Sequence, residues 1–416
     1  VKNMGYNISG SELNDPEVQA LLKKFGTTLT LNPKEIEEDQ KIVKYPEYLH
    51  ATEPSDEGKF YTFQNPDGAK NDKGRLGDKS FKNLFKGKYT ISDLSPNFGS
   101  EIDGIQLSEL DDAGKNDLAL LLETRALVVF RNQDLKDKGP QFNKEFGEYF
   151  GPLHIHPVSL SVKDYPELFV TYRRPGDGTR YEREFGNRDT LSGFHSDISF
   201  EEYPASFSFF VALEAPKTGG DTVFIDTREA YRRLSPYYQK FLEGLTAIHS
   251  NYYQNLFAKV VGGKAKVKAD YFTEHPLVRT HPVTGEKGLY YSRAFIQRIK
   301  GLKKKESDSV LNFLEDHFLK NPEIQVRASH NGTDAGTVVA WDNRILLHSA
   351  VTDFLQHTTG PRHHYRITVL GEKPYFDPNQ ETIYGPVGFL DKSDDANGAN
   401  GHTNGHANVN GHTNGH

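Results

Sequence analysis

The sequence predicts an all-β core with flanking helices, arranged as a barrel or a sandwich. Between residues 206 and 372, short runs rich in β-branched and aromatic residues alternate with turn signals. The predicted strands read SFSFFVALEAP, GGDTVFID, LYYS, GTVVAWDN and YRITVLGE. Segments with helical character, residues 226–245 and 307–320, interrupt these runs. A chain of 416 residues with 36% hydrophobic and 26% charged residues can bury a large core.

The first 88 residues are predicted to form a polar arm that wraps a domain or is partly disordered. They are rich in Lys, Asp, Gly and Pro, as in NPDGAKNDKGRLGDKS. Regular patterning begins at residue 89 and marks a main domain that extends to residue 373. A C-terminal segment, residues 374–393, and an Asn/Gly/His-rich tail, residues 394–416, follow it. The tail is expected to be disordered, so its histidines have no preformed metal geometry.

The main domain is predicted to begin with a helix and a buried strand. In residues 110–125 one side of the helix carries Leu118, Leu121 and Leu122. The run ALVVFRN, residues 126–132, follows and is typical of a buried strand. The later helix at 307–320 has an apolar stripe of Val310, Leu311, Leu314 and Phe318. The lysines just before that helix are expected to be its solvated start.

Composition excludes several classes of function. The formal net charge of −7 argues against binding to nucleic acid or to an anionic membrane. The chain has no cysteine, so a metal would need His, Asp or Glu ligands. The first residues, VKNMGYNISGSELND, lack the features of a signal peptide, and the apolar runs are too short to span a bilayer. We therefore expect a cytoplasmic protein.

The stretch LSGFHSDISF, residues 191–200, contains a candidate pair of metal ligands. His195-Ser196-Asp197 is the only His-x-Asp in a chain with 17 histidines, although about one such match is expected by chance. If the stretch is a strand, residues two apart project to the same face, so His195 and Asp197 would point into one interior. Its apolar residues are Phe194, Ile198 and Phe200.

His348 is a candidate for the third ligand. It follows a hydrophobic strand and a turn-like WDNR in the segment GTVVAWDNRILLHSA. Two histidines and one carboxylate on one face suit a non-haem Fe(II) oxygenase and leave positions open for a cosubstrate and dioxygen. The same three ligands also suit a catalytic zinc. The stretch alone equally allows a buried histidine that forms a hydrogen bond near the end of a strand.

Two further segments carry candidate anion-binding residues. In a strand, the segment GPRHHYRITVL places Arg362, His364 and Arg366 on one face. Guanidinium groups that face an interior need anionic partners, which are either a bound acid or internal carboxylates. In TGGDTVF, the hydroxyl of Thr222 could donate to a bound acid, whereas the simpler reading is a hairpin turn.

Together these segments resemble the taurine dioxygenase family of Fe(II)- and 2-oxoglutarate-dependent oxygenases. The motifs in order are FGPLHIHPV, FHSDISFEEYPA, LEAPKTGGDTVF, VRTHPVTGEKGLYYS, VVAWDNRILLHSA and RHHYRITVLGEKP. The resemblance covers residues 89–373, and the length and polar arm look like the fungal sulfonate dioxygenase branch. It implies that the all-β core is a double-stranded β-helix, or jelly roll, and that the domain at 89–373 is catalytic.

The resemblance also implies a role for individual residues. His195, Asp197 and His348 match the iron ligands, and Thr222 and Arg362 match the residues that hold the far carboxylate of 2-oxoglutarate. The sulfonate-binding positions fall on His156 and Arg366, and an aromatic position near the substrate falls on Tyr290. Two pocket positions depart from the family pattern, Leu191 and Ser159. Residues 176–190 are expected to form a lid over the site.

The implied reaction hydroxylates a small sulfonate at the carbon next to sulfur. It consumes 2-oxoglutarate and O2, forms succinate and CO2, and releases sulfite and an aldehyde. One alternative keeps this chemistry with an alkyl sulfate or a small carboxylate as substrate, and others are a non-catalytic jelly-roll binding protein and a zinc hydrolase. The expected partner is a small anionic molecule, with neither nucleic acid nor membrane, and the family suggests a homo-oligomer.

Overall fold

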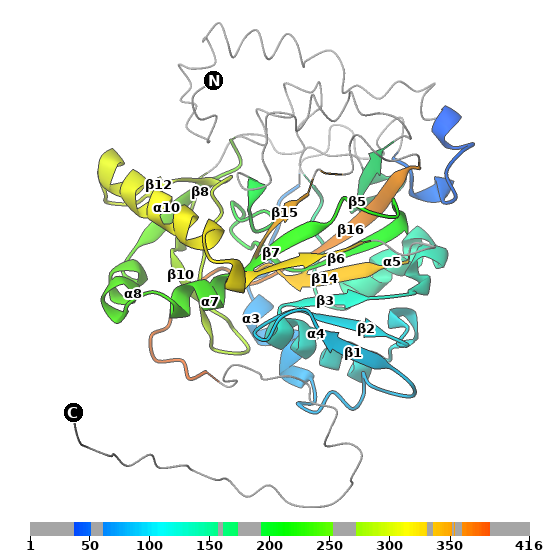
Figure 1. The fold of residues 1–416 in the computed structure, drawn as a ribbon, viewed down its shortest axis with the longest axis horizontal. Helices are drawn as coiled ribbons and strands as arrows, with labels where there is room; N and C mark the ends of the chain where they lie inside the picture. The colour runs from blue at the N-terminus through cyan, green and yellow to red at the C-terminus, as the bar shows by residue number, and fades with distance from the viewer. Residues whose placement is uncertain are drawn as a thin grey trace, which may run out of the picture.

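The computed structural model shows a sheet-rich core with helices on its outside (Figure 1). It describes residues 37–50, 61–156, 161–173, 193–252, 272–330, 336–351, 353 and 360–382. The large sheet fans out across the right of the view, and helices α8 (Pro236–Glu243) and α10 (Lys304–Leu319) lie on the left. The all-β core with flanking helices that the sequence predicts is therefore confirmed.

An eight-stranded sheet forms the centre of the described structure. Its spatial order is β1 (Thr90–Asp93), β2 (Ser100–Asp103), β3 (Leu127–Phe130), β14 (Val338–Asp342), β6 (Ala205–Glu214), β16 (Arg362–Leu370), β5 (Tyr165–Arg173) and β4 (Ser161–Val162). Only β2 and β3 pair in parallel, and the other neighbours are antiparallel. Strands from the start, middle and end of the chain thus lie side by side.

Three smaller sheets complete the described β-structure. The first consists of β13 (Gln325–Ala328), β7 (Thr222–Asp226) and β15 (Leu346–Ala350), and the second of β12 (Ile296–Ile299), β8 (Thr246–Ser250) and β9 (Phe272–Pro276). The third pairs β10 (Val278–Thr280) with β11 (Lys287–Leu289). Residues of β13, β7 and β15 pack against β3 and β14 of the large sheet.

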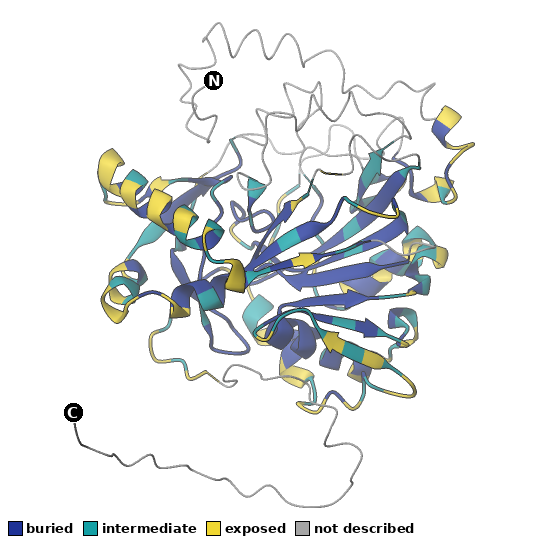
Figure 2. Cartoon of the chain, in the orientation of Figure 1, coloured by how far each residue is buried: buried dark blue, intermediate teal, exposed yellow. Residues whose placement is uncertain are grey.

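The large sheet is covered on both faces, which explains its apolar sequence. On β3, Val128 and Phe130 pack into a cluster with α4 (Asp112–Arg125) and α5 (Gly139–Glu148), whereas Leu127 and Val129 pack into a second cluster with residues of β7 and β13. Alternate residues of a strand point to opposite faces, so a run of apolar residues is needed where both faces are buried. The central strands are accordingly dark blue in Figure 2.

The remaining helices are short or surround the smaller sheets. They are η2 (Pro46–Tyr48), α3 (Gly68–Asn71), η3 (Lys73–Leu76), η4 (Leu107–Glu109), η5 (Asp134–Asp137), α7 (Thr227–Arg232) and η7 (Pro322–Ile324). The predicted stripe of α10 is buried in a cluster with α7, α8 and β8, while its outer face is exposed (Figure 2). Among the described residues, none of the helices has the length and apolar character needed to cross a membrane.

Two segments differ from the sequence prediction in local detail. The segment 226–245 forms two helices, α7 and α8, because Pro236 begins a new helix whose first turn is capped by the Ser235 hydroxyl. In the run LYYS only Leu289 belongs to a strand. The next backbone N–H, of Tyr290, donates to the carbonyl of Leu277, which continues the β10–β11 register by one pair, and the strand ends there.

The described parts of residues 1–88 pack against the core. Tyr48 is buried, and its ring stacks on Tyr365 of β16 with centroids 4.7 Å apart. Gly74, in η3, lies directly against the Glu123 carboxylate of α4. The boundaries of the arm, the main domain and the C-terminal segments stay predictions, and residues 394–416 lie outside the described residues.

A buried charge network ties this N-terminal region to the β14–β15 turn. The guanidinium of Arg344 donates to Asp72 at 2.6 Å, to Glu123 at 3.0 Å and to Asp342 at 2.7 Å. Burial, and then the nearby charge of Asp72, raise the pKa of Glu123 well above its ordinary value. Burial opposes ionisation of Asp72 and Asp342, but Arg344 outweighs it and lowers the pKa of both. The turn that precedes His348 is thereby fixed to α4 and to residues 61–88.

We expect Arg344→Met to lower the free energy of unfolding by about 3–5 kcal/mol, because it leaves buried carboxylates without their cation. The measurement is a urea titration followed by circular dichroism. The matched control is Arg233→Met, which removes the partly exposed guanidinium of a weak surface pair and should change stability by about 1 kcal/mol or less. Equal losses in the two variants would contradict a structural role for the network.

Candidate metal centre

His195 and His348 are placed side by side by their own backbones. The N–H of His195 donates to the carbonyl of His348 at 3.1 Å, and the N–H of His348 donates back to His195 at 2.9 Å. This isolated antiparallel bridge joins residues 153 positions apart to within a ring–ring distance of 4.4 Å. Directly opposed residues of an antiparallel pair project to the same side, so the two imidazoles point into one space.

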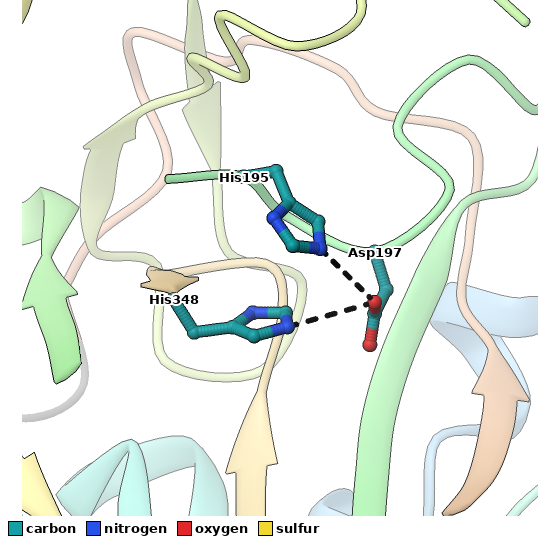
Figure 3. A group of neighbouring side chains, drawn as sticks. All are labelled: His195, Asp197 and His348. Carbon is teal, nitrogen blue, oxygen red and sulfur yellow. Dashed lines mark ion pairs between the residues drawn. The ribbon is translucent and has the colours of Figure 1, made fainter. Parts of the chain in front are cut away.

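The Asp197 carboxylate completes the trio, as Figure 3 shows. Its Oδ1 atom lies 3.7 Å from Nε2 of His195 and 3.6 Å from Nε2 of His348. One ligand atom from each residue can be chosen so that all three lie within 4.8 Å of one another. The three residues that the sequence predicts as metal ligands therefore come together in the structure.

The stretch LSGFHSDISF does not meet the condition considered from the sequence, namely that it is a strand. Among the described residues 193–200, only His195 makes a β-bridge, and residues 197–200 form a turn in which Ile198 has a φ of 47°. The reason is that Asp197 donates its backbone N–H to a side chain, that of Asn343, rather than to a neighbouring strand. His195 and Asp197 still face each other, but a turn brings them together instead of strand alternation.

His195 offers a lone pair from Nε2, and His348 is uncharged at neutral pH. Nδ1 of His195 lies 2.7 Å from the carbonyl of Gly193, which can only accept, so this nitrogen carries the proton and Nε2 is unprotonated in the neutral ring. Burial, followed by the neighbouring His195, lowers the pKa of His348 to about 3. At neutral pH His348 is consequently uncharged and able to act as a ligand.

Asp197 remains ionised although it is buried. Burial alone would raise its pKa, but Arg366, followed by the two histidines, lowers the pKa well below the ordinary value. Arg366 Nη1 donates to Oδ1 at 2.8 Å, and the Ser208 hydroxyl donates to Oδ2 at 2.8 Å. Both interactions stabilise the charged form, which is the form that binds a metal.

Asn343 holds the turn that carries Asp197. Its Oδ1 accepts from the Asp197 N–H at 3.2 Å and from Trp341 Nε1 at 2.9 Å. Its Nδ2 donates to the hydroxyl of Ser208 at 2.9 Å, and its backbone carbonyl accepts from the hydroxyl of Ser196 at 2.8 Å. One buried amide thus connects both sides of the Asp197 turn with β6 and β14.

The donor set fits a divalent transition metal with open positions. Two neutral imidazole nitrogens and one carboxylate oxygen converge, and the carboxylate supplies the negative charge that a divalent ion requires. Three protein ligands leave other coordination positions for additional molecules. Fe(II) and zinc both accept this set, so the trio alone does not distinguish an oxygenase from a hydrolase.

A second cluster contains Thr222 and Arg362. Thr222 begins β7, and its hydroxyl lies 2.7 Å from Nε2 of His330. Arg362 begins β16, donates to the carbonyl of Gly220 at 3.3 Å and lies over the ring of Phe210. The charge of Arg362 acts on His330, whose pKa falls to about 3 mainly through burial and then through this charge. Thr222 and Arg362, predicted as partners, therefore share their immediate surroundings.

The predicted anion-binding residues His156 and Arg366 contact one aromatic ring. The imidazole of His156 stacks on Phe169 with centroids 4.7 Å apart, and the guanidinium of Arg366 lies 4.9 Å from the same ring. Phe169 and Arg366 are register partners on β5 and β16. This cluster therefore adjoins the metal trio through the ion pair of Arg366 with Asp197.

Tyr290 lies in a different cluster. Its ring contacts the buried imidazoles of His249 and His275, and the guanidinium of Arg279 lies 4.8 Å from its centroid. Its role near a substrate therefore stays a prediction. Three positions of the sequence analysis lie outside the described residues, namely Leu191, Ser159 and the predicted lid 176–190.

Comparison with known proteins identifies the family. A family model described as "Taurine catabolism dioxygenase TauD, TfdA family" matches residues 90–368. The chain belongs to this family. It is 41% identical over 351 residues, 82% of each chain, to the alpha-ketoglutarate-dependent sulfonate dioxygenase of Saccharomyces cerevisiae. It is 35% identical over 361 residues, 84% of this chain and 93% of the relative, to the alpha-ketoglutarate-dependent dioxygenase cnsP of Penicillium expansum.

A solved structure of a taurine dioxygenase from Burkholderia xenovorans agrees with this assignment. It matches with a TM-score of 0.56 and 29% identity over 71% of this chain and 93% of that one. The resemblance to the TauD/TfdA family and the prediction of a 2-oxoglutarate-dependent dioxygenase are therefore confirmed.

Sequence reasoning missed the residues that hold the ligands of this TauD/TfdA-family site. Asn343 lies in the WDNR segment, which the sequence predicts only as a turn, and asparagine is so common in turns that its local sequence gives no signal of this role. Ser208 is one of several serines in a strand, and nothing local distinguishes it. Both act through contacts with Asp197, which only the folded chain brings within reach.

We expect Asn343→Ala to weaken Fe(II) binding by about tenfold to a hundredfold, because the Asp197 turn loses its support and groups that orient ligands typically have effects of this size. Anaerobic titration of Fe(II) measures the affinity. Asn321→Ala, which removes an amide bonded to the end of α10, is the control and should bind Fe(II) like the parent protein. An unchanged affinity in the Asn343 variant would show that the turn is held in other ways.

Proposed function

We propose that this protein is an Fe(II)- and 2-oxoglutarate-dependent sulfonate dioxygenase. It oxidises a small alkyl sulfonate at the carbon next to sulfur and releases an aldehyde and sulfite, while 2-oxoglutarate and O2 give succinate and CO2. The observation that carries the proposal is the trio of His195, Asp197 and His348 with an arginine, Arg366, directly beside it. The yeast relative, which is named a sulfonate dioxygenase, supports the choice of substrate class.

His195, Asp197 and His348 would hold the iron. With its cosubstrates bound, Fe(II) supplies the oxidising power for hydroxylation. The chain's own contribution is to leave Nε2 of His195 unprotonated, to keep His348 uncharged and to keep the Asp197 carboxylate charged. Asp197 and His348 are buried, so the trio is largely shielded from water. We further propose that the sheets form the double-stranded β-helix implied by the family resemblance.

Thr222 and Arg362 would bind the far carboxylate of 2-oxoglutarate. On paired strands, His348 lies opposite Phe224, and Thr222 lies two residues further along the same face of β7. Two residues along a strand correspond to about 7 Å, which suits a five-carbon diacid extending from the metal. The planar guanidinium of Arg362 suits bidentate binding of a carboxylate.

His156 and Arg366 would bind the sulfonate of the substrate. Arg366 uses Nη1 for Asp197, whereas its Nε–H makes no hydrogen bond to any described residue. The Nε–H of Arg366 would therefore donate a second hydrogen bond, to an anion that lies beside the metal. His156 is half-buried and adds a ring N–H on the same aromatic platform, Phe169. A sulfonate held there would present its neighbouring carbon to the metal.

The proposal predicts turnover with at least one small sulfonate. The Fe(II)-loaded protein, prepared without oxygen, would be mixed with 2-oxoglutarate, O2 and a panel of sulfonates, alkyl sulfates and carboxylates. We expect succinate and an equal amount of sulfite with a sulfonate. Succinate that rises only with a sulfate or carboxylate would refute the sulfonate assignment and retain the oxygenase. No succinate with any member, despite bound iron, would refute the oxygenase.

We expect His156→Leu to raise KM for the sulfonate by about tenfold or more, since it removes a hydrogen bond to a charged group. The dissociation constant of 2-oxoglutarate should stay unchanged, because the variant leaves Thr222 and Arg362 intact. Arg366 is less informative, because it also supports Asp197. His317→Leu, at a half-buried histidine of α10, controls for the loss of an imidazole. Weaker binding of 2-oxoglutarate in the His156 variant would contradict a role of His156 in binding the sulfonate alone.

A further inference from the structure

His364 occupies the position on β16 between the two anion-binding arginines. Side chains two residues apart in a strand share a face, so His364 lies on the face that carries Arg362 and Arg366. The opposite face is occupied by the core, where His363 lies 3.3 Å from the carbonyl of Tyr48. The imidazole of His364 is fully buried, although it belongs to the face that carries the site.

The ring of His364 has aromatic neighbours but no hydrogen-bond partner in the part of the chain that the structure describes. It stacks on Phe210 with centroids 4.7 Å apart and meets the ring of His330 edge-on at 5.7 Å. Neither of its nitrogens forms a hydrogen bond to a described residue. Buried polar groups in folded proteins are almost always hydrogen-bonded, so two orphan ring nitrogens call for a partner that binds from outside the chain.

His330 is the second histidine of this cluster, and its Nε2 lies 2.7 Å from the Thr222 hydroxyl. A threonine hydroxyl has one proton to donate. If Thr222 donates that proton to a ligand, its oxygen must accept from His330, which then carries its proton on Nε2. This tautomer leaves Nδ1 unprotonated, and Nδ1 indeed donates to no described residue. His330 thereby turns Thr222 into a donor with a defined direction.

The charge of the cluster suits a single carboxylate. Burial, followed by the charge of Arg362, lowers the pKa of both imidazoles, to about 3 for His330 and well below the ordinary value for His364. Both rings are therefore neutral at pH 7. Arg362 supplies the positive charge beside the two rings, since Arg131, whose charge also acts on His330, is paired with Glu101. One such charge with neutral donors matches a monoanion better than a phosphate or sulfate dianion.

We propose that His364 donates a ring N–H to the far carboxylate of 2-oxoglutarate beside Arg362 and Thr222, and that His330 positions the Thr222 hydroxyl for the same carboxylate. This inference rests on the proposed function. His364 contacts the ligand itself, whereas His330 acts through Thr222. Together they would make this part of the cosubstrate site discriminate more strongly than an arginine alone against a 2-oxo acid without the far carboxylate. Such a ligand would leave these buried donors without a hydrogen-bond acceptor.

The test compares two ligands that differ only at the far end. Calorimetry without oxygen would give the dissociation constants of 2-oxoglutarate and of 2-oxopentanoate, which lacks the far carboxylate, for the Fe(II)-loaded protein. We expect His364→Met to weaken 2-oxoglutarate about tenfold or more and to change 2-oxopentanoate by about twofold at most. His364→Gln, which retains an N–H donor, should recover most of the affinity.

The outcomes separate this inference from the function on which it rests. If the parent protein prefers 2-oxoglutarate but His364→Met binds it equally well, the role of His364 is refuted and the cosubstrate site stands. Equal weakening of both ligands in His364→Met also refutes the role, because it indicates a general defect in the site. A parent protein that does not distinguish the two ligands refutes the cosubstrate site itself.

The role of His330 requires a test through Thr222. We expect His330→Phe to weaken 2-oxoglutarate several-fold in the parent protein and to have no further effect in a Thr222→Val background, where the hydroxyl is absent. An equal loss in both backgrounds would refute the positioning role. The second background keeps the test decisive, since a purely structural defect would appear in both.

Discussion

The site depends on keeping one buried carboxylate ionised. An isolated carboxylate that is removed from water takes up a proton instead. Around Asp197 the chain opposes this with a guanidinium from β16 and a hydroxyl from β6, each 2.8 Å from a carboxylate oxygen. The neighbouring histidine, His348, comes from β15 of another sheet. The carboxylate therefore lies between the two sheets, which are held against each other by the apolar core between them.

The register of β16 organises the site along a single strand. Its residues 362, 364 and 366 face the site, while Tyr365 and Ile367 on the other face belong to the core. Because the side-chain period of a strand is two, a slip of one residue would exchange these two sets. The stack of Tyr365 on Tyr48 and the pairing of β16 with both β5 and β6 oppose such a slip. Core packing on one face thus fixes the spacing of charged groups on the other.

The sequence predicted the three side chains that converge at the site but not the way they are held. His195, Asp197 and His348 could be recognised because residue type and order along the chain are local information. The strand considered at Asp197 does not form, because a side chain 146 residues away, Asn343, binds the Asp197 N–H within a turn. Arg344 likewise pairs with Asp72 across 272 residues. Contacts over such separations leave no periodic pattern in a sequence, whereas a strand or helix that buries one face does.

The backbone bridge between His195 and His348 has a consequence for metal binding. The two hydrogen bonds that join these residues involve main-chain atoms and need no metal. Two of the three predicted ligands are therefore held together by the backbone alone, so little conformational entropy would be lost when an ion binds. Under the proposed function, loss of the ion would leave this bridge in place, and both imidazoles would still face the position that a returning ion takes.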